Sequence, residues 1–286
     1  MAKVSDTCSF LRILEAKSLK RILFIGGGNM ARAIIGGLCQ DSCQPLIHVV
    51  EPNEAIAAGL RDEFACSTSA GIGEAADSAD VVVLAVKPDV VPRVCEFLRP
   101  RLRRQIIVSI VSGLTCTQLD GWLSGKCEVV RAMPNTPALV RSGMTGLFAL
   151  HKVSHTARGA ATAMFEAVGK VLWTTDESMI DAMTAISGSG PAYMFYLVEA
   201  LAGAAESLGF SPEQARTLAE TTAIGSMSLL NCSDESASQL RTRVTSKGGT
   251  TAAAISMLEK CGVREAITDA AQAARARAVE LRTVYS

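Results

Sequence analysis

Four small residues, Gly248–Thr251, stand at the start of a predicted helix that extends from Thr251 to Lys260. A helix start needs one capping residue, so two glycines and two threonines are more than the helix itself requires. A second stretch of this kind, Ser187–Gly190, precedes a helix expected to begin at Pro191. Loops rich in glycine and hydroxyl groups present backbone N–H groups to anions when they lead into a helix. The two stretches therefore predict a ligand lying against the backbone, with an anionic group such as a carboxylate.

A third glycine-rich segment, Gly26–Gly28, ends an apolar run and opens a helix, giving the pattern Gly26-x-Gly28-x-x-Ala31. In the dinucleotide-binding fingerprint the first glycine permits a tight turn, and the second lets the backbone approach a pyrophosphate. The small Ala31 allows the helix to pack closely on the strand. The alternative is a glycine-rich turn without a ligand. The position between a strand and a helix favours dinucleotide binding.

The ends of the following strands are expected to complete this site, because ligands bind at the carboxyl edge of a parallel sheet. Glu51 ends the second strand, where an acid usually binds the ribose 2′-OH and favours NADH; Asn53 and its neighbour Pro52 leave room for a 2′-phosphate. The choice between NADPH and NADH stays open. The predicted cofactor-binding residues are Ile25, Gly26, Gly27, Gly28, Asn29, Met30, Glu51, Asn53, Ala85, Val86, Lys87, Pro88, Val111, Ser112, Gly113 and Asn135.

The elements that must position these residues change character near Thr175. Before it, short apolar runs alternate with helical patterns, which is typical of a parallel sheet covered on both faces. The predicted strands are Arg21–Gly26, Leu46–Glu51, Asp80–Val86, Gln105–Val111, Cys127–Met133, Met144–Leu150 and Lys170–Trp173. After it the patterns are helical, over Pro191–Leu208, Pro212–Leu230, Glu235–Arg241, Thr251–Lys260 and Val263–Arg282.

The fold class expected is α/β: a Rossmann-like, mostly parallel sheet domain followed by an all-α domain. The predicted divisions are an N-terminal extension at 1–19 with a short helix over Ser9–Ala16, a dinucleotide-binding domain at 20–175, and a helical domain at 176–286. The last helices are apolar over much of their circumference, and five helices cannot bury that surface alone. We therefore expect a second copy of the chain to cover it, in at least a dimer.

Composition excludes several functions. The chain of 286 residues has 28 Lys and Arg against 28 Asp and Glu, which argues against nucleic-acid binding. No apolar run reaches the roughly 20 residues of a membrane span, and the start lacks the apolar core of a secretion signal, so a cytoplasmic protein is expected. The nine cysteines are expected to be reduced, since neither C-x-x-C nor a metal-ligand spacing occurs. No metal site is predicted.

Five motifs in order, FIGGGNMARAI, AVKP, MPNTP, SGSGPAY and TSKGGTT, resemble those of the pyrroline-5-carboxylate reductases. The resemblance covers about Lys20 to Leu281. It implies reduction of 1-pyrroline-5-carboxylate to L-proline with NADPH or NADH, by a dinucleotide-binding domain and a helical dimerisation domain. It also implies a homodimer through the helical half, which in some members is stacked into a decamer, a pentamer of dimers.

The resemblance further implies roles for particular residues. Thr251 would be the catalytic threonine, bonding near the ring nitrogen of the substrate. The substrate-binding residues would be Ser187, Gly188, Ser189, Gly248, Gly249, Thr250 and Thr251. The chain departs from the family pattern in two places. Lys247 stands where many members have proline, and the acidic position before the SGSG motif is matched only loosely, by Asp176 or Glu177.

The chemistry also agrees with what the chain lacks. A protonated C=N bond accepts hydride with little acid catalysis, so the protein must mainly hold the carboxylate and aim the ring carbon. None of the three histidines, His48, His151 and His155, lies in a motif. Two alternatives remain: a β-hydroxyacid dehydrogenase, which would need a catalytic lysine that Tyr193–Leu208 lacks, and a dinucleotide-binding redox sensor without turnover, which would need no second anion site.

Overall fold

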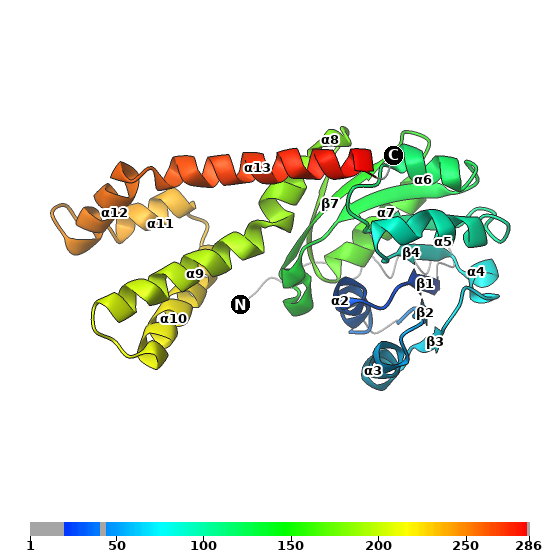
Figure 1. Ribbon diagram of the computed structural model, residues 1–286, viewed down its shortest axis with the longest axis horizontal. Coiled ribbons are helices and arrows are strands. Elements are labelled where there is room, and N and C mark those ends of the chain that lie inside the picture. The colour runs from blue at the N-terminus through cyan, green and yellow to red at the C-terminus, as the bar shows by residue number, and fades with distance from the viewer. Residues whose placement is uncertain (1–19, 41–43, 285–286) are drawn as a thin grey trace. The chain divides into compact units, whose positions relative to one another are not determined.

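The computed structural model describes residues 20–40 and 44–284. Its central feature is an eight-stranded sheet in the order β3-β2-β1-β4-β5-β6-β7-β8 (Figure 1). All neighbouring strands are parallel except β6 and β7, which are antiparallel. The strands are β1 Arg21–Ile25, β2 Leu46–Val50, β3 Ser67–Ser69, β4 Val81–Leu84, β5 Ile106–Ser109, β6 Glu128–Met133, β7 Gly143–Ala149 and β8 Gly169–Trp173. The predicted mostly parallel α/β fold is confirmed.

Alternate residues of each buried strand supply two separate cores, one on each face of the sheet. In β1, Ile22 and Phe24 pack with α2, α3 and α7, whereas Leu23 and Ile25 pack with α4, α5, α6 and α8. Near-continuous apolar strands are required because both faces are covered. The helices are α2 Asn29–Leu38, α3 Glu54–Phe64, α4 Ala75–Ser78, α5 Val91–Leu98, α6 Cys116–Trp122, α7 His155–Glu166 and α8 Ser178–Met183; the 3₁₀ turns are η1 Pro88–Val90 and η2 Thr136–Val140.

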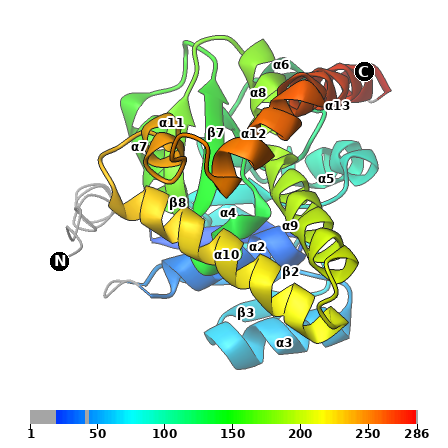
Figure 2. The ribbon, with the colours of Figure 1, turned by 90° about the vertical axis from the view of Figure 1, so that its left-hand side faces the viewer.

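Beyond β8 the described chain is helical, as predicted. A π-helical turn, η3 Thr184–Gly188, follows α8. The later helices are α9 Gly190–Ser207, α10 Pro212–Cys232, α11 Ala237–Arg243, α12 Thr250–Lys260 and α13 Val263–Val284 (Figure 2). The chain forms two compact units. The first unit comprises the chain up to Ser189 together with the segment from Ala274 onward. The second unit is Gly190–Ala273. The predicted helix at Ser9–Ala16 lies outside the described residues.

The second unit has almost no core of its own. Within Gly190–Ala273 only Ala215 and Ala219 are buried. Large apolar side chains of α9 and α10 are exposed, with Phe195 at 69%, Tyr196 at 70% and Ile224 at 67%. Apolar surface of this extent is typical of an association surface.

Candidate active site

The predicted cofactor residues converge on one edge of the sheet. The chain runs from β1 outward to β2 and β3, then returns to the other side of β1 as β4, so the strand order reverses between β1 and β4. A crevice outside the carboxyl ends of the strands at such a reversal is where α/β sheets bind ligands. Gly26–Gly28 follow β1 and Ala85–Lys87 follow β4 at this point. Glu51, Val111–Gly113 and Asn135 follow the neighbouring strands β2, β5 and β6.

The glycines at this edge of the sheet are there for different physical reasons. Gly26 has a φ of +102°, and a Cβ there would lie 2.5 Å from the Ala85 carbonyl oxygen. The fold therefore requires glycine at this position, whatever binds nearby. Gly28 differs, because its φ of −66° is open to any residue and a Cβ would meet nothing within 4 Å.

Gly28 is also the N-cap of α2 and provides no side-chain cap, so the first N–H groups of that helix have no partner within it. Such a helix start suits a pyrophosphate, which needs close approach to the backbone and gains from the helix dipole. The donor set and the space left by Gly28 fit a dinucleotide.

Glu51 is held in place by the fingerprint loop. Its Oε2 accepts from the N–H of Gly27 at 2.9 Å, and its Oε1 accepts from the N–H of Asn53 at 2.9 Å. Asn53 in turn caps α3, with its Oδ1 accepting from the N–H groups of Ala55 and Ile56. One half-buried carboxylate thus joins the ends of β1 and β2 and carries a negative charge at the position expected for the adenosine ribose.

The remaining edge positions vary in exposure. Lys87 is exposed and directly precedes η1, which has Pro88 at its first position as predicted. Val111 and Gly113 are buried and Ser112 is half-buried. The side chain of Asn135 is buried and engaged at both ends. Its Nδ2 donates to the Ser187 carbonyl at 2.9 Å, and its Oδ1 accepts from the Met144 N–H at 2.8 Å.

The prediction that Ser187–Gly190 forms a loop was wrong, whereas a helix, α9, does begin at Gly190, one residue before Pro191. The chain is already helical from Ser178, and Thr184–Gly188 forms a π-helical turn. The N–H of Ser189 donates to the Thr184 carbonyl at 2.8 Å, so it is not free for an anion. The hydroxyl of Ser187 donates to the Met183 carbonyl at 2.9 Å. Glycine and serine composition suggested a loop, whereas hydrogen bonding within the turn keeps it helical.

The two acids before this turn have structural partners. Asp176 accepts from the N–H and hydroxyl of Ser178, and these hydrogen bonds lower the pKa of its carboxyl. Glu177 Oε1 accepts from the Cys116 N–H at 2.8 Å and from Arg131 at 3.2 Å. These contacts favour a structural role for both acids over the substrate contact considered from the sequence.

Arg131 is the centre of a buried ion cluster that the sequence analysis missed. It lies on β6, its side chain is 3% exposed, and it contacts Glu177 and Asp181 of the α8 region. Asp181 is 1% exposed, and its Oδ2 lies 3.2 Å from Arg282 Nη1, an ion-pair contact without good hydrogen-bond alignment. A single arginine within the apolar run Cys127–Met133 was the available signal, since a buried charge must be paired.

The Gly248–Thr251 stretch lies in the helical unit. Gly248 has a φ of +74°, and the N–H of Gly249 donates to the Ser246 carbonyl at 3.1 Å. A Cβ on Gly249 would lie 2.5 Å from Ser246 Oγ, a hydroxyl that can rotate away, so the turn does not itself require glycine at this position. Gly249 is the N-cap of α12 and provides no side-chain cap.

The neighbouring helices begin differently. Ser211 and Ser236 form full capping boxes at the starts of α10 and α11. At α12 the first N–H groups, those of Thr250 and Thr251, have no partner inside the helix, and the Thr251 hydroxyl makes no hydrogen bond to any described residue. The start of α12 therefore has the unpaired donors that a carboxylate needs.

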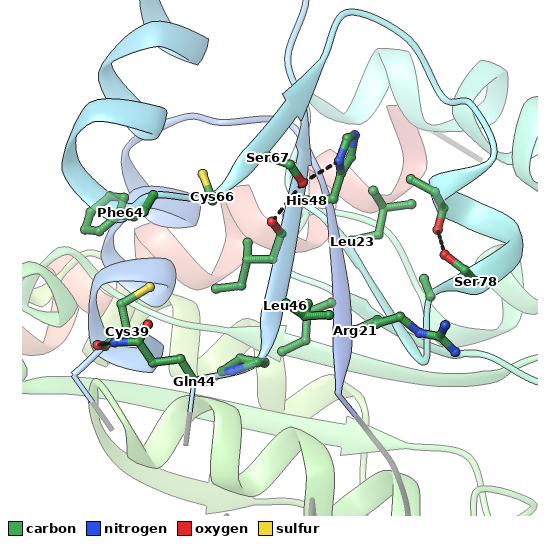
Figure 3. Close-up of a pocket in the computed structure, with 16 residues that line it drawn as sticks. Arg21, Leu23, Cys39, Gln44, Leu46, His48, Phe64, Cys66, Ser67 and Ser78 are labelled. Carbon is green, nitrogen blue, oxygen red and sulfur yellow. Dashed lines mark hydrogen bonds between the residues drawn. The ribbon is translucent and has the colours of Figure 1, made fainter. Parts of the chain in front are cut away.

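A pocket of about 530 Å³ lies at the opposite end of the sheet. Figure 3 shows the residues that line it. It is lined by Arg21 and Leu46, the first residues of β1 and β2, so it lies away from the carboxyl edge. His48 at its wall is held by the hydroxyls of Ser67 and Ser69, both at 2.8 Å, and burial lowers the pKa of the imidazole. This arrangement is that of a structural histidine.

The cysteines of the described chain are free. Burial raises the pKa of Cys95 and of Cys116 to about 12 and that of Cys127 to about 11, so these thiols are unreactive. Within residues 20–40 and 44–284, no group of three or more His, Cys, Asp or Glu residues could hold a metal ion. No helix of that part is long and apolar enough to cross a membrane.

Sequence comparison finds two families along the chain. The family described as "Pyrroline-5-carboxylate reductase dimerisation" matches residues 177–281, and that described as "NADP oxidoreductase coenzyme F420-dependent" matches residues 21–113. The pyrroline-5-carboxylate reductase of Pseudomonas aeruginosa is 44% identical over 92% of this chain and 97% of its own. That of Mycobacterium tuberculosis H37Rv is 38% identical over 92% and 97%.

Solved structures agree with the sequence matches. A pyrroline-5-carboxylate reductase from Coxiella burnetii superposes with a TM-score of 0.87 at 41% identity, covering 92% of this chain and 98% of that one. The pyrroline carboxylate reductase of Plasmodium falciparum, crystallised with NADP bound, gives a TM-score of 0.79 at 28% identity, covering 92% and 98%.

Proposed function

The chain belongs to the pyrroline-5-carboxylate reductase family, and from this premise we propose how its residues carry out the reaction. The activity is reduction of 1-pyrroline-5-carboxylate to L-proline with NADPH or NADH, the last step of proline biosynthesis. The observation that carries the assignment of residues is the convergence of Gly26–Gly28, Glu51, Ala85–Lys87 and Val111–Gly113 at the strand reversal, with α2 left uncapped at Gly28.

These edge residues hold the cofactor in our proposal. The N–H groups at the start of α2 bind the pyrophosphate, Glu51 and Asn53 face the adenosine ribose, and the segments after β4 and β5 lie along the rest of the dinucleotide. When bound, NADPH or NADH supplies the hydride. The protein contributes binding, orientation and exclusion of water.

The substrate is held by its carboxylate in the same proposal. The N–H groups of Thr250 and Thr251 at the start of α12 bind the carboxylate. The resemblance to the family also gives the turn at Ser187–Ser189 a part in substrate binding. The Thr251 hydroxyl orients the protonated ring nitrogen, since a hydroxyl can accept its N–H. Hydride arriving at the ring carbon breaks the C=N π bond, and the electron pair passes to that nitrogen, which already carries its proton. No histidine is required.

The chain carries the family's dimerisation region, which indicates a homo-oligomer. We propose a homodimer formed through α9 and α10, whose exposed Phe195, Tyr196 and Ile224 would be covered by the partner. Stacking of dimers into a decamer, and a cytoplasmic location, stay predictions. A molar mass of one chain by light scattering at micromolar concentration would contradict the dimer.

The function is tested by following oxidation of NADPH and of NADH with 1-pyrroline-5-carboxylate, beside oxidation of 3-hydroxyacids with NAD⁺ and NADP⁺. We expect turnover with the imine and none with the hydroxyacids. The reverse pattern would indicate a β-hydroxyacid dehydrogenase, and cofactor binding without turnover would indicate a redox sensor.

Replacing Glu51 with glutamine is expected to shift the ratio of the Kd values for NADH and NADPH by about tenfold toward NADPH. The reason is that a carboxylate held beside the ribose repels a 2′-phosphate, and a like-charge contact of this kind amounts to about 1 kcal/mol or more. Fluorescence titration of both cofactors measures the two Kd values. A general loosening of the loop would change both values alike and leave their ratio unchanged. The control is Asp62→Asn, which also removes one negative charge but at an exposed position of α3. It should leave the ratio unchanged. An unchanged ratio in the Glu51 variant would place Glu51 away from the ribose.

A further inference from the structure

Three helical segments follow one another between Ser178 and Ser207, namely α8, η3 and α9, and Pro191 is the second residue of α9. In a regular α-helix the Ser187 carbonyl would accept from the N–H of residue 191, but that residue is Pro191, which has none. The proline ring also disfavours a carbonyl four residues before it. The chain widens at this point into the π-helical turn, in which Ser189 bonds five residues back, to Thr184. The Ser187 carbonyl is consequently left without a donor from its own helix.

Asn135 supplies the missing donor from another element. Its Nδ2 lies 2.9 Å from the Ser187 carbonyl oxygen, across 52 residues of sequence. Its Oδ1 accepts from the Met144 N–H, a contact that only the oxygen of the amide can make, so the nitrogen must face Ser187. Asn135 is 8% exposed and follows β6 at the carboxyl edge of the sheet. The amide therefore joins this edge to the π-helical turn.

From this geometry we propose that Asn135 is a positioning residue, which holds the Ser187–Ser189 turn against the cofactor edge of the sheet by replacing the donor that Pro191 lacks. The inference rests on the proposed function of that turn in substrate binding. π-helical turns are rare and occur frequently at functional sites. Asn135 stabilises the widened turn, and with both amide atoms engaged it acts through Ser187 and not by direct contact with the cofactor.

The variant Asn135→Asp isolates this hydrogen bond. The Oδ1 atom of the aspartate keeps the contact with the Met144 N–H. A carboxylate oxygen replaces the Nδ2 group that donates to the Ser187 carbonyl. We expect kcat/KM for 1-pyrroline-5-carboxylate to fall at least about tenfold, because a displacement of about 1 Å in a binding element can cost far more than that. The Kd values of NADH and NADPH should change less than about twofold, since cofactor contacts lie elsewhere. Asn231→Asp, the same change at an exposed position of α10, is the control and should alter neither quantity.

A second variant separates positioning from stability. Pro191→Ala returns an N–H at residue 191, so the Ser187 carbonyl can be satisfied within a regular helix. Asn135→Asp alone should lower the melting temperature, because it leaves the Ser187 carbonyl without a donor. In the double variant we expect the melting temperature to return to the wild-type value or above, while kcat/KM stays low because the turn is no longer widened. Recovery of both quantities would overturn the proposal, since the bond would then serve stability alone.

The other outcomes are equally decisive. A loss of cofactor affinity by the same factor as kcat/KM would make Asn135 a cofactor contact and overturn the positioning role. An Asn135→Asp enzyme with kcat/KM within twofold of wild type would do the same. A wild-type chain without imine turnover would instead contradict the proposed function, and this role of Asn135 with it.

Discussion

Replacing Thr251 with alanine is expected to lower kcat by about tenfold to a hundredfold. The proposed hydrogen bond joins a hydroxyl to a charged ring nitrogen, and such bonds contribute about 1.5–3 kcal/mol. Folding should be affected far less. The Thr251 hydroxyl bonds to no described residue, and alanine is the better helix former, so the free energy of unfolding should change by less than about 1 kcal/mol.

Steady-state kinetics and thermal unfolding of the same preparations measure the two quantities. Thr251→Ser keeps the hydroxyl and should retain most of the turnover. Thr217→Ala, on α10, removes a threonine hydroxyl that donates to the carbonyl of Glu213 in its own helix, and it controls for the loss of any threonine from the helical unit. Equal losses of folding and activity in Thr251→Ala would show that the threonine only caps α12.

Replacing Arg131 with methionine is expected to lower the free energy of unfolding by about 3–5 kcal/mol. Removing one partner of a buried ion cluster leaves the other charges without compensation, and Asp181 is almost fully buried. Two further residues belong to this cluster: Glu177 pairs with Arg131, and Arg282, near the end of α13, pairs with Asp181. Denaturant unfolding measures the loss.

The matched control is Arg101→Met, in the unit that holds the sheet. Arg101 pairs with Asp77 at 2.9 Å, but the two side chains are 38% and 47% exposed, and such pairs contribute less than about 1 kcal/mol. A loss in Arg131→Met no larger than in this control would mean that the buried cluster does not stabilise the fold.

The sheet and its cofactor edge could be predicted because their signals are local. Each buried strand is a short apolar run, and Gly26–Gly28 lie where one such run meets a helix. The strand β3, Ser67–Ser69, was missed because three small polar residues carry no apolar signal. Its position comes from pairing with β2, where His48 lies opposite Ser67.

The π-helical turn could not be predicted because its stability depends on a distant residue. Ser187–Gly190 has the composition of a loop, and proline usually marks a helix start. The chain nevertheless stays helical as far as Gly188, and the Ser187 carbonyl, which Pro191 cannot bond, finds a donor on Asn135. The ion cluster is similar: Arg131 was visible as a charge in an apolar run, but Glu177 and Asp181 lie 46 and 50 residues away.

The measurement that tests the central claim most directly follows the hydride itself. NADH or NADPH labelled with deuterium on the transferable position of the nicotinamide is incubated with the enzyme and 1-pyrroline-5-carboxylate, and the product is analysed by mass spectrometry and NMR. We expect L-proline with one deuterium on the ring carbon that was doubly bonded to nitrogen. Proline without the label, or no proline while the cofactor is bound, would contradict hydride transfer to the C=N bond.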